Sequence, residues 1–105
     1  MSFSLRFETI ALQELKQAAR WYDECRSGLG QQFMDAVDQL IVRVLENPYA
    51  FPKSPNHALV RRAVMKRFPF IIVFVVHEQE VHVLSISHSR RRPGHWISRL
   101  ARTRA

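Results

Sequence analysis

The chain has 105 residues, 47% hydrophobic and 24% charged, which is the composition of a folded protein rather than a disordered one. This length allows one hydrophobic core, and we expect residues 1–105 to form a single domain. The most apolar stretch, 68–76, is much shorter than the ~20 residues of a transmembrane helix, and the N-terminus lacks the features of a signal peptide. We therefore expect a soluble, cytoplasmic protein without membrane contact, and the lone cysteine excludes an internal disulfide.

The first half of the chain predicts one strand and two helices. Phe3, Leu5 and Phe7 alternate with polar residues, as in a short strand. From residue 9 the apolar spacing changes to three and four, and Ser27-Gly28 ends this helix. Its predicted apolar stripe is Leu12, Leu15, Ala19 and Tyr22, flanked by Ala11, Ala18 and Cys25.

A second apolar stripe at helical spacing follows the glycine turn and stops at Asn47-Pro48. Two helices joined by so short a turn are expected to pack as an antiparallel hairpin. The stripe comprises Phe33, Val37, Leu40, Ile41, Val44 and Leu45.

The second half predicts strands. Residues 47–57 contain three prolines and are expected to form a surface loop. Three strands follow at 59–67, 70–76 and 81–87, and the middle one should be central because both of its faces are β-branched or aromatic.

A short helical tail is predicted at 94–102, with Trp96 and Leu100 on one side. The order of strand, helical hairpin, three strands and tail predicts an α+β fold in two layers. In this fold the hairpin covers one face of an antiparallel sheet region.

Charge is distributed unevenly along the chain. Residues 1–52 carry five Lys or Arg against seven Asp or Glu, whereas residues 53–105 carry eleven against two. Thirteen of the sixteen basic residues are arginine, which binds phosphate and carboxylate groups through paired hydrogen bonds. The C-terminal half should therefore bind an anion, either nucleic acid or an acidic protein segment. A basic face that only improves solubility is the alternative.

The five histidines and the single cysteine are the other candidates for chemistry. Their spacing supports no metal site, and we expect no metal or other cofactor. His88 and His95 flank the run Arg90-Arg91-Arg92, where neighbouring cations disfavour a charged imidazole; His88 is thus a candidate general base. A structural role at the strand end is the alternative for His88, and Cys25 is expected to pack in the core.

The remaining feature is a set of basic side chains with Trp96 beside them. Trp96 can stack on a base or pack the tail onto the sheet, and packing is the favoured interpretation. The full basic set is Lys53, Arg61, Arg62, Lys66, Arg67, Arg90, Arg91, Arg92, Arg99, Arg102 and Arg104. The predicted binding surface is Arg61, Arg62, Lys66, Arg67, Arg90, Arg91, Arg92, Trp96 and Arg99.

Segments along nearly the whole chain form an ordered set. They are residues 14–24, Gly28-Leu29-Gly30, Phe33, Asn47-Pro48, Phe51-Pro52, Arg62, Arg67-Phe68-Pro69-Phe70 and residues 86–96. In this order they resemble the RelE/ParE superfamily of toxins from type II toxin–antitoxin systems, especially its ParE-like members. The resemblance implies the α+β fold described above and a growth-inhibiting toxin that a cognate acidic antitoxin neutralises.

The resemblance also identifies positions that RelE-like ribonucleases use for catalysis. These enzymes use two lysines, two arginines and a C-terminal tyrosine, and by the resemblance their positions fall at Arg62, Val64, Ile71, Arg90 and Trp96. Two cationic positions remain, but arginine stays protonated and carries protons poorly, and tryptophan does not titrate. Only His88 and His95 are left to replace the missing groups.

We therefore expect a ParE-like toxin that acts by binding, with DNA gyrase as the favoured target. An mRNA-cleaving toxin acting at the ribosome is the alternative, with candidate catalytic residues His88, Arg90, Arg62 and Lys66. A non-toxic basic binding module is the third possible function. The expected partner is an acidic, partly disordered antitoxin that folds onto the basic sheet region or the helical hairpin.

Overall fold

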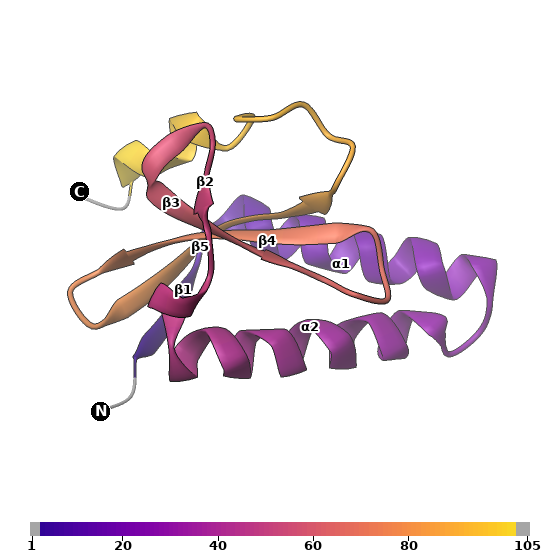
Figure 1. The fold of residues 1–105 in the computed structure, drawn as a ribbon. Helices are drawn as coiled ribbons and strands as arrows, with labels where there is room; N and C mark the ends of the chain where they lie inside the picture. The colour runs from indigo at the N-terminus through magenta and orange to yellow at the C-terminus, as the bar shows by residue number, and fades with distance from the viewer. Residues whose placement is uncertain (1–2, 103–105) are drawn as a thin grey trace.

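The structure, a computed structural model, describes residues 3–102 as a five-stranded sheet with two long helices (Figure 1). The sheet order is β1-β5-β4-β3-β2; β1 is parallel to β5 and every other pair is antiparallel. The elements are β1 (Ser4–Phe7), α1 (Thr9–Cys25), α2 (Leu29–Glu46), the 3-10 helix η1 (Pro48–Ala50), β2 (Lys53–Ser54), β3 (His57–Val64), β4 (Phe70–His77), β5 (Glu80–His88) and the 3-10 helix η2 (Ile97–Arg102).

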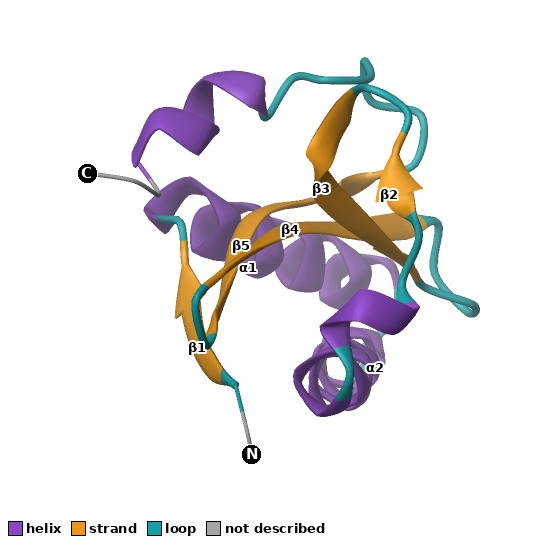
Figure 2. Ribbon diagram, turned by 60° about the vertical axis from the view of Figure 1, so that its left-hand side comes forward, coloured by secondary structure: helices purple, strands orange, loops and turns teal. Residues whose placement is uncertain are grey.

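The predicted α+β class and the antiparallel helical hairpin are confirmed. Figure 2 shows α1 and α2 on one side of the sheet and η2 on the other. We call residues 89–102, which follow β5 and include η2, the tail. The predicted helical tail is thus a turn followed by a 3-10 helix, and it covers part of the sheet face that the hairpin leaves open.

Small residues place α1 close to the sheet. Ala11, Leu15, Ala18 and Tyr22 are its buried residues. The prediction that Leu12 is buried is wrong, because the two alanines take the inward positions and turn Leu12 outward, where it is 37% exposed.

The prediction that Cys25 packs in the core is also wrong, since this side chain is exposed. Cys25 is the last residue of α1, and the turn end of the helical hairpin extends beyond the sheet (Figure 1). No strand therefore lies beneath it.

The turn between the helices depends on two glycines. Gly28 has a φ of +88°, a left-handed conformation that costs glycine little. A Cβ on Gly30 would lie 2.4 Å from the backbone oxygen of Ala19, so this position sets how closely α2 approaches α1. Asp23 Oδ1 accepts hydrogen bonds from the amides of Gly28 and Gly30, both at 3.0 Å, and fixes the turn.

The stripe predicted for α2 is confirmed except at its end, where Leu45 is only half-buried. The loop predicted at 47–57 is wrong in part, because η1 and the two-residue strand β2 lie within it. Pairing of β2 with β3 supplies the tertiary backbone hydrogen bonds that make a strand of this short segment. The next strand, predicted at 59–67, ends at Val64.

The predicted central strand and the hairpin after it are confirmed. β4 pairs with β3 on one side and with β5 on the other. Its two-residue turn to β5 places Glu78 at a φ of 58°, which is uncommon for a residue other than glycine. Alternate β4 residues point to opposite faces, so the strand contributes to two separate cores.

The helix-facing core lies between the hairpin and the sheet and includes Phe33, Ile72 and Phe74, each with no exposed area. The tail-facing core is smaller and lies on the opposite face. It comprises Val60, Val73, Val75, Leu84 and Trp96. No helix within residues 3–102 is long and apolar enough to span a bilayer.

Candidate functional site

The outer edge of β5 is only partly covered by β1, and an ion pair completes it. β1 pairs with β5 through Val83 and goes no further. Beyond that point Glu14 of α1 accepts a hydrogen bond from the amide of Ile86 at 3.1 Å, and Arg99 of the tail donates to the oxygen of Leu84 at 2.8 Å. Two side chains thus satisfy backbone groups that a neighbouring strand would otherwise pair.

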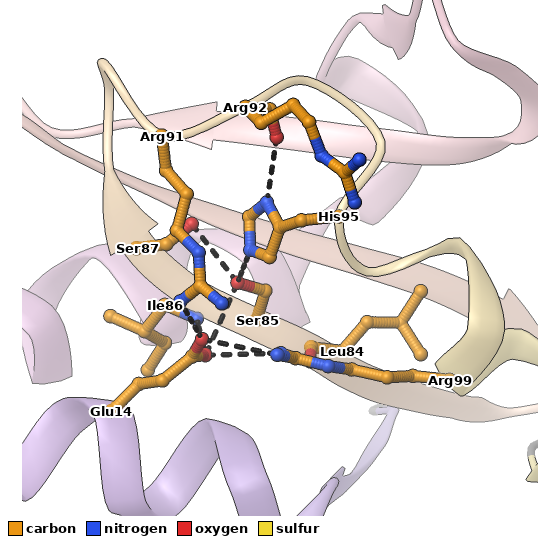
Figure 3. A network of polar contacts seen from close by, with 9 residues as sticks. All are labelled: Glu14, Leu84, Ser85, Ile86, Ser87, Arg91, Arg92, His95 and Arg99. Carbon is orange, nitrogen blue, oxygen red and sulfur yellow. Dashed lines mark hydrogen bonds and ion pairs between the residues drawn. The ribbon is translucent and has the colours of Figure 1, made fainter.

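Glu14 also forms ion pairs with two arginines of the predicted binding surface, as Figure 3 shows. Its carboxylate lies 2.9 Å from Arg91 Nη1 and 3.1 Å from Arg99 Nη1. The side chains of Glu14 and Arg99 are only 11% and 5% exposed, so this pair is largely removed from water. Arg99 therefore holds the tail against β5, and its charge does not face a partner.

No pattern in the sequence indicates this contact. Glu14 lies on the polar side of the helical pattern, and its partners Arg91 and Arg99 are 77 and 85 residues away in the chain. Only the packing of α1 beside β5 brings them together.

Arg61 and Arg67, two further members of the predicted surface, also have internal partners. Arg61 Nη1 donates to the oxygen of Phe51 at 2.7 Å and its guanidinium lies over the Tyr49 ring. Arg67 donates to Gln32 Oε1. These contacts fix the segment before β3 and the β3–β4 turn, respectively.

Arg62 differs from these residues because it enters a small cavity, which we call the cationic hollow. The cavity has a volume of about 70 Å³ and lies between the tail-facing side of the sheet and the start of the tail. Arg62 Nε is buried and has no hydrogen-bond partner within the described residues. The charged or titratable side chains around the hollow are Arg62, His88, Arg91, Arg92 and His95.

His95 is held at both ring nitrogens. Nδ1 lies 3.0 Å from the backbone oxygen of Arg92, and Nε2 lies 3.1 Å from Ser85 Oγ (Figure 3). Because a carbonyl oxygen only accepts, Nδ1 carries the proton of the neutral ring. Burial lowers the pKa of His95, and the nearby Arg91 and Arg99 add to this effect. The ring is therefore neutral and already hydrogen-bonded, which disfavours a role as an acid or base.

His88 lies at the boundary between the cationic hollow and a second cavity. Its ring is exposed, packs edge-on against Phe70 with centroids 5.6 Å apart, and accepts the amide hydrogen of Arg90 at Nδ1. The second cavity, of about 390 Å³, is what we call the apolar hollow. It is lined by Ala18, Trp21, Tyr22, Pro69, Phe70 and His88.

Lys66 lies in neither hollow. It lines a groove of about 400 Å³ between α2 and the β3–β4 turn, together with Asp35 and Arg43. The structure therefore does not bring the four candidate catalytic residues together. Arg62 and His88 share the cationic hollow, Arg90 follows His88 at the surface, and Lys66 faces the helices.

The remaining positions of the RelE comparison hold apolar side chains. Val64 is 56% exposed, Ile71 packs against the tail-facing core, and Trp96 is 4% exposed within it. Trp96 thus packs the tail onto the sheet, as the favoured interpretation predicted. The side chains of Lys66, Arg90 and Arg92 form no ion pair with any described residue. Arg104 lies outside the described residues, as does the side chain of Arg102.

A fully buried histidine lies near the start of β5. His82 is 1% exposed; its Nε2 lies 3.3 Å from Glu8 Oε2 and its Nδ1 lies 3.5 Å from Arg6 Nη2. Burial lowers the pKa of His82, an effect that Arg6 strengthens and Glu8 opposes. No group of three potential metal ligands is found among residues 3–102.

The fold and these sites define a small α+β protein with a helical hairpin on one sheet face and a cluster of arginines and histidines around the cationic hollow on the other. The chain belongs to the ParE toxin family of type II toxin–antitoxin systems (parDE), whose sequence model matches residues 5–93. The comparison with curated proteins gives no significant match.

Solved structures agree with this fold. A structure of the chromosomal ParDE system from P. aeruginosa is 23% identical, with a TM-score of 0.63 over 82% of this chain and 95% of that one. The free E. coli toxin RelE, as a double arginine-to-alanine mutant, is 20% identical with a TM-score of 0.66 over 98% of each chain. The same mutant in complex with an antitoxin RelBc peptide is 18% identical, with a TM-score of 0.66 over 100% of this chain and 96% of that one.

Proposed function

We propose that this family member is a cytoplasmic, growth-inhibiting toxin in which residues 1–105 form a single domain, and that it acts by binding DNA gyrase. The observation that favours action by binding over RNA cleavage is that the candidate catalytic residues lie apart from one another. Arg62 and His88 share a hollow, but Lys66 lines a separate groove beside α2. Cleavage without a metal needs a base, an acid and phosphate-stabilising groups around one phosphate.

The partner that restrains the toxin is proposed to be a cognate acidic antitoxin. Lys66, Arg90 and Arg92 are exposed and have no ion-pair partner within residues 3–102, so they can attract an acidic segment. Similar folds are known from a ParDE system and from RelE bound to an antitoxin RelBc peptide. A disordered acidic segment that folds over the start of the tail would cover Arg90 and Arg92, and Lys66 lies in the separate groove beside α2.

A supercoiling assay tests the target. Purified protein is added to gyrase, relaxed plasmid and ATP, and we expect loss of supercoiling and accumulation of gyrase-linked DNA breaks. Arg90→Glu reverses an exposed charge and should raise the inhibitory concentration at least about tenfold. The matched control is Arg20→Glu, on the exposed side of α1. Undisturbed supercoiling at a large excess of wild-type protein would exclude gyrase.

A ribosome-dependent ribonuclease is the second candidate, because Arg62 and His88 line one cavity on the tail-facing side of the sheet. The test incubates the protein with translating ribosomes and maps mRNA ends by primer extension. Cuts in phase with codons that disappear in His88→Gln would establish cleavage and refute action by binding alone.

A growth assay separates both candidates from a non-toxic basic binding module. Induction of the chain without its partner should arrest growth, and co-expression with the neighbouring antitoxin gene should restore it. Normal growth with folded protein present would contradict the toxin function itself.

A further inference from the structure

The cationic hollow contains a positive charge that nothing in the described structure balances. Arg62 Nε is buried without an acceptor, and the residues around the hollow include no aspartate or glutamate. Arg62 itself is half-buried, but a buried N–H without an acceptor is unfavourable, and an anion that enters the hollow can restore the missing hydrogen bond. Arg91, which also lines this hollow, is ion-paired with Glu14, whose carboxylate it shares with Arg99, whereas Arg62 forms no ion pair with a described residue. Arg62 is therefore the group that requires an anion.

The size of the cavity limits the anion. At about 70 Å³, the hollow admits a small group but not a nucleotide. A phosphodiester carries a sugar on each side, whereas the carboxylate of Asp or Glu is attached through only one or two methylene groups and can enter a narrow cavity. The planar guanidinium of Arg62 matches a carboxylate with two parallel N–H donors. Asn56, Ser87 and Ser89 line the same cavity and offer further polar groups.

The neighbouring cavity indicates that the carboxylate belongs to a protein. His88 lines both the cationic hollow and the apolar hollow, so the two are adjacent. The apolar hollow is bordered by Trp21, which is 58% exposed, and by the half-buried Phe70. A peptide can place an acidic side chain on one side of His88 and an aliphatic or aromatic side chain on the other.

We propose that the cationic hollow binds a carboxylate side chain of the protein partner, with Arg62 as its ligand and the apolar hollow receiving a neighbouring apolar side chain. The identification of that partner as the antitoxin rests on the proposed function. The site links the two features that an acidic amphipathic segment carries, charge and an apolar anchor.

Titration with small probes tests the site directly. The probe is N-acetylglutamate methylamide, followed through the backbone amide signals of Ser87 and Ser89, which line the hollow in the wild type and in the variants, in ¹⁵N NMR spectra of the whole chain. We expect a saturable shift that Arg62→Gln weakens at least about tenfold, the loss expected for a charge-assisted hydrogen bond. Arg20→Gln, on the exposed side of α1, is the matched control and should bind as the wild type does.

Three outcomes would overturn the proposal. They are no saturable shift, equal binding by Arg62→Gln, or tighter binding of the dinucleotide UpU than of the glutamate probe, which would assign the hollow to nucleic acid. If Arg62→Gln does not fold, Arg92→Gln at the exposed rim provides the same comparison, with binding weakened several-fold. A protein that arrests growth but binds no carboxylate would contradict this inference alone, whereas binding without growth arrest would contradict the proposed function alone.

Discussion

The two faces of the sheet are built differently. The helix-facing core is closed by two long helices and contains most of the fully buried side chains, including Phe33 and Phe74. The tail-facing side has a small core around Trp96 and, beside it, the cationic hollow. The difference indicates that one face stabilises the fold while the other, closed only by a short tail and an ion pair, can hold charges for a partner.

The largest expected effect tests the helix-facing core. Phe33 has no exposed area, and its ring contacts those of Tyr22, Phe68 and Phe70 at centroid distances of 5.2, 5.2 and 5.0 Å. Phe33→Ala should lower the free energy of unfolding by about 4 kcal/mol through lost burial and the cavity left behind. Urea unfolding followed by circular dichroism measures this.

The matched control for this prediction is Trp21→Ala, since the side chain is 58% exposed. It should change stability by no more than about 0.5 kcal/mol. A loss below about 1 kcal/mol in Phe33→Ala would mean that the helix-facing core does not dominate stability.

An intermediate effect is expected at the ion pair that closes the other face. Glu14→Gln leaves Arg99, only 5% exposed, without its counter-charge, and should cost about 3 kcal/mol. The tail should loosen while the helices persist, so the emission of Trp96 should shift to longer wavelength in a Trp21→Phe background.

Arg91→Gln is the control for this variant, because the Arg91 side chain is 48% exposed. An exposed ion pair contributes about 1 kcal/mol or less. Unchanged stability and unchanged Trp96 emission in Glu14→Gln would show that the tail does not depend on this carboxylate.

The smallest expected effect is a pH dependence from the buried histidines. Burial lowers the pKa of His82 and of His95 below the ordinary value of 6.5. At a pH near or below 6.5 the unfolded chain then binds more protons than the folded one. The free energy of unfolding should therefore be constant at higher pH and fall as the pH drops below about 6.5. Thermal unfolding between pH 7.5 and 5.5 measures the slope.

His82→Asn should flatten this slope, whereas His77→Asn, at an exposed position, should leave it unchanged. If the His82 variant keeps the full slope, the pH dependence has another origin.

Local patterns predicted most of the elements, and particular residues show where they failed. The helical hairpin and the central strand follow from residue spacing, because burial of one face imposes a period on the sequence. β2 was missed because its two residues, Lys53 and Ser54, have no period of their own and form a strand only by pairing with β3. Leu12 and Cys25 fit the apolar pattern of α1 but lie where no core reaches them.

The candidate site was less predictable than the fold. The sequence identified Arg62, His88 and the arginine run, but it could not divide them among the cationic hollow, the surface and the ion pair with Glu14. The apolar hollow also went unpredicted, since its residues come from α1, the β3–β4 turn, the start of β4 and the end of β5.

By itself, the sequence determined the order of the elements, the excess of positive charge in the second half and the resemblance to a toxin family that the comparisons then showed. Only the tertiary structure decided which cations form ion pairs, which face water, and that Arg62 has a buried N–H without a partner among the described residues. The physical reason is that burial of one face of a helix or strand makes apolar residues recur at a fixed spacing, which can be seen in a short stretch of sequence. Pairing of charges depends instead on contacts such as that of Glu14 with Arg99, 85 residues apart, which exist only once the helix lies beside the sheet edge.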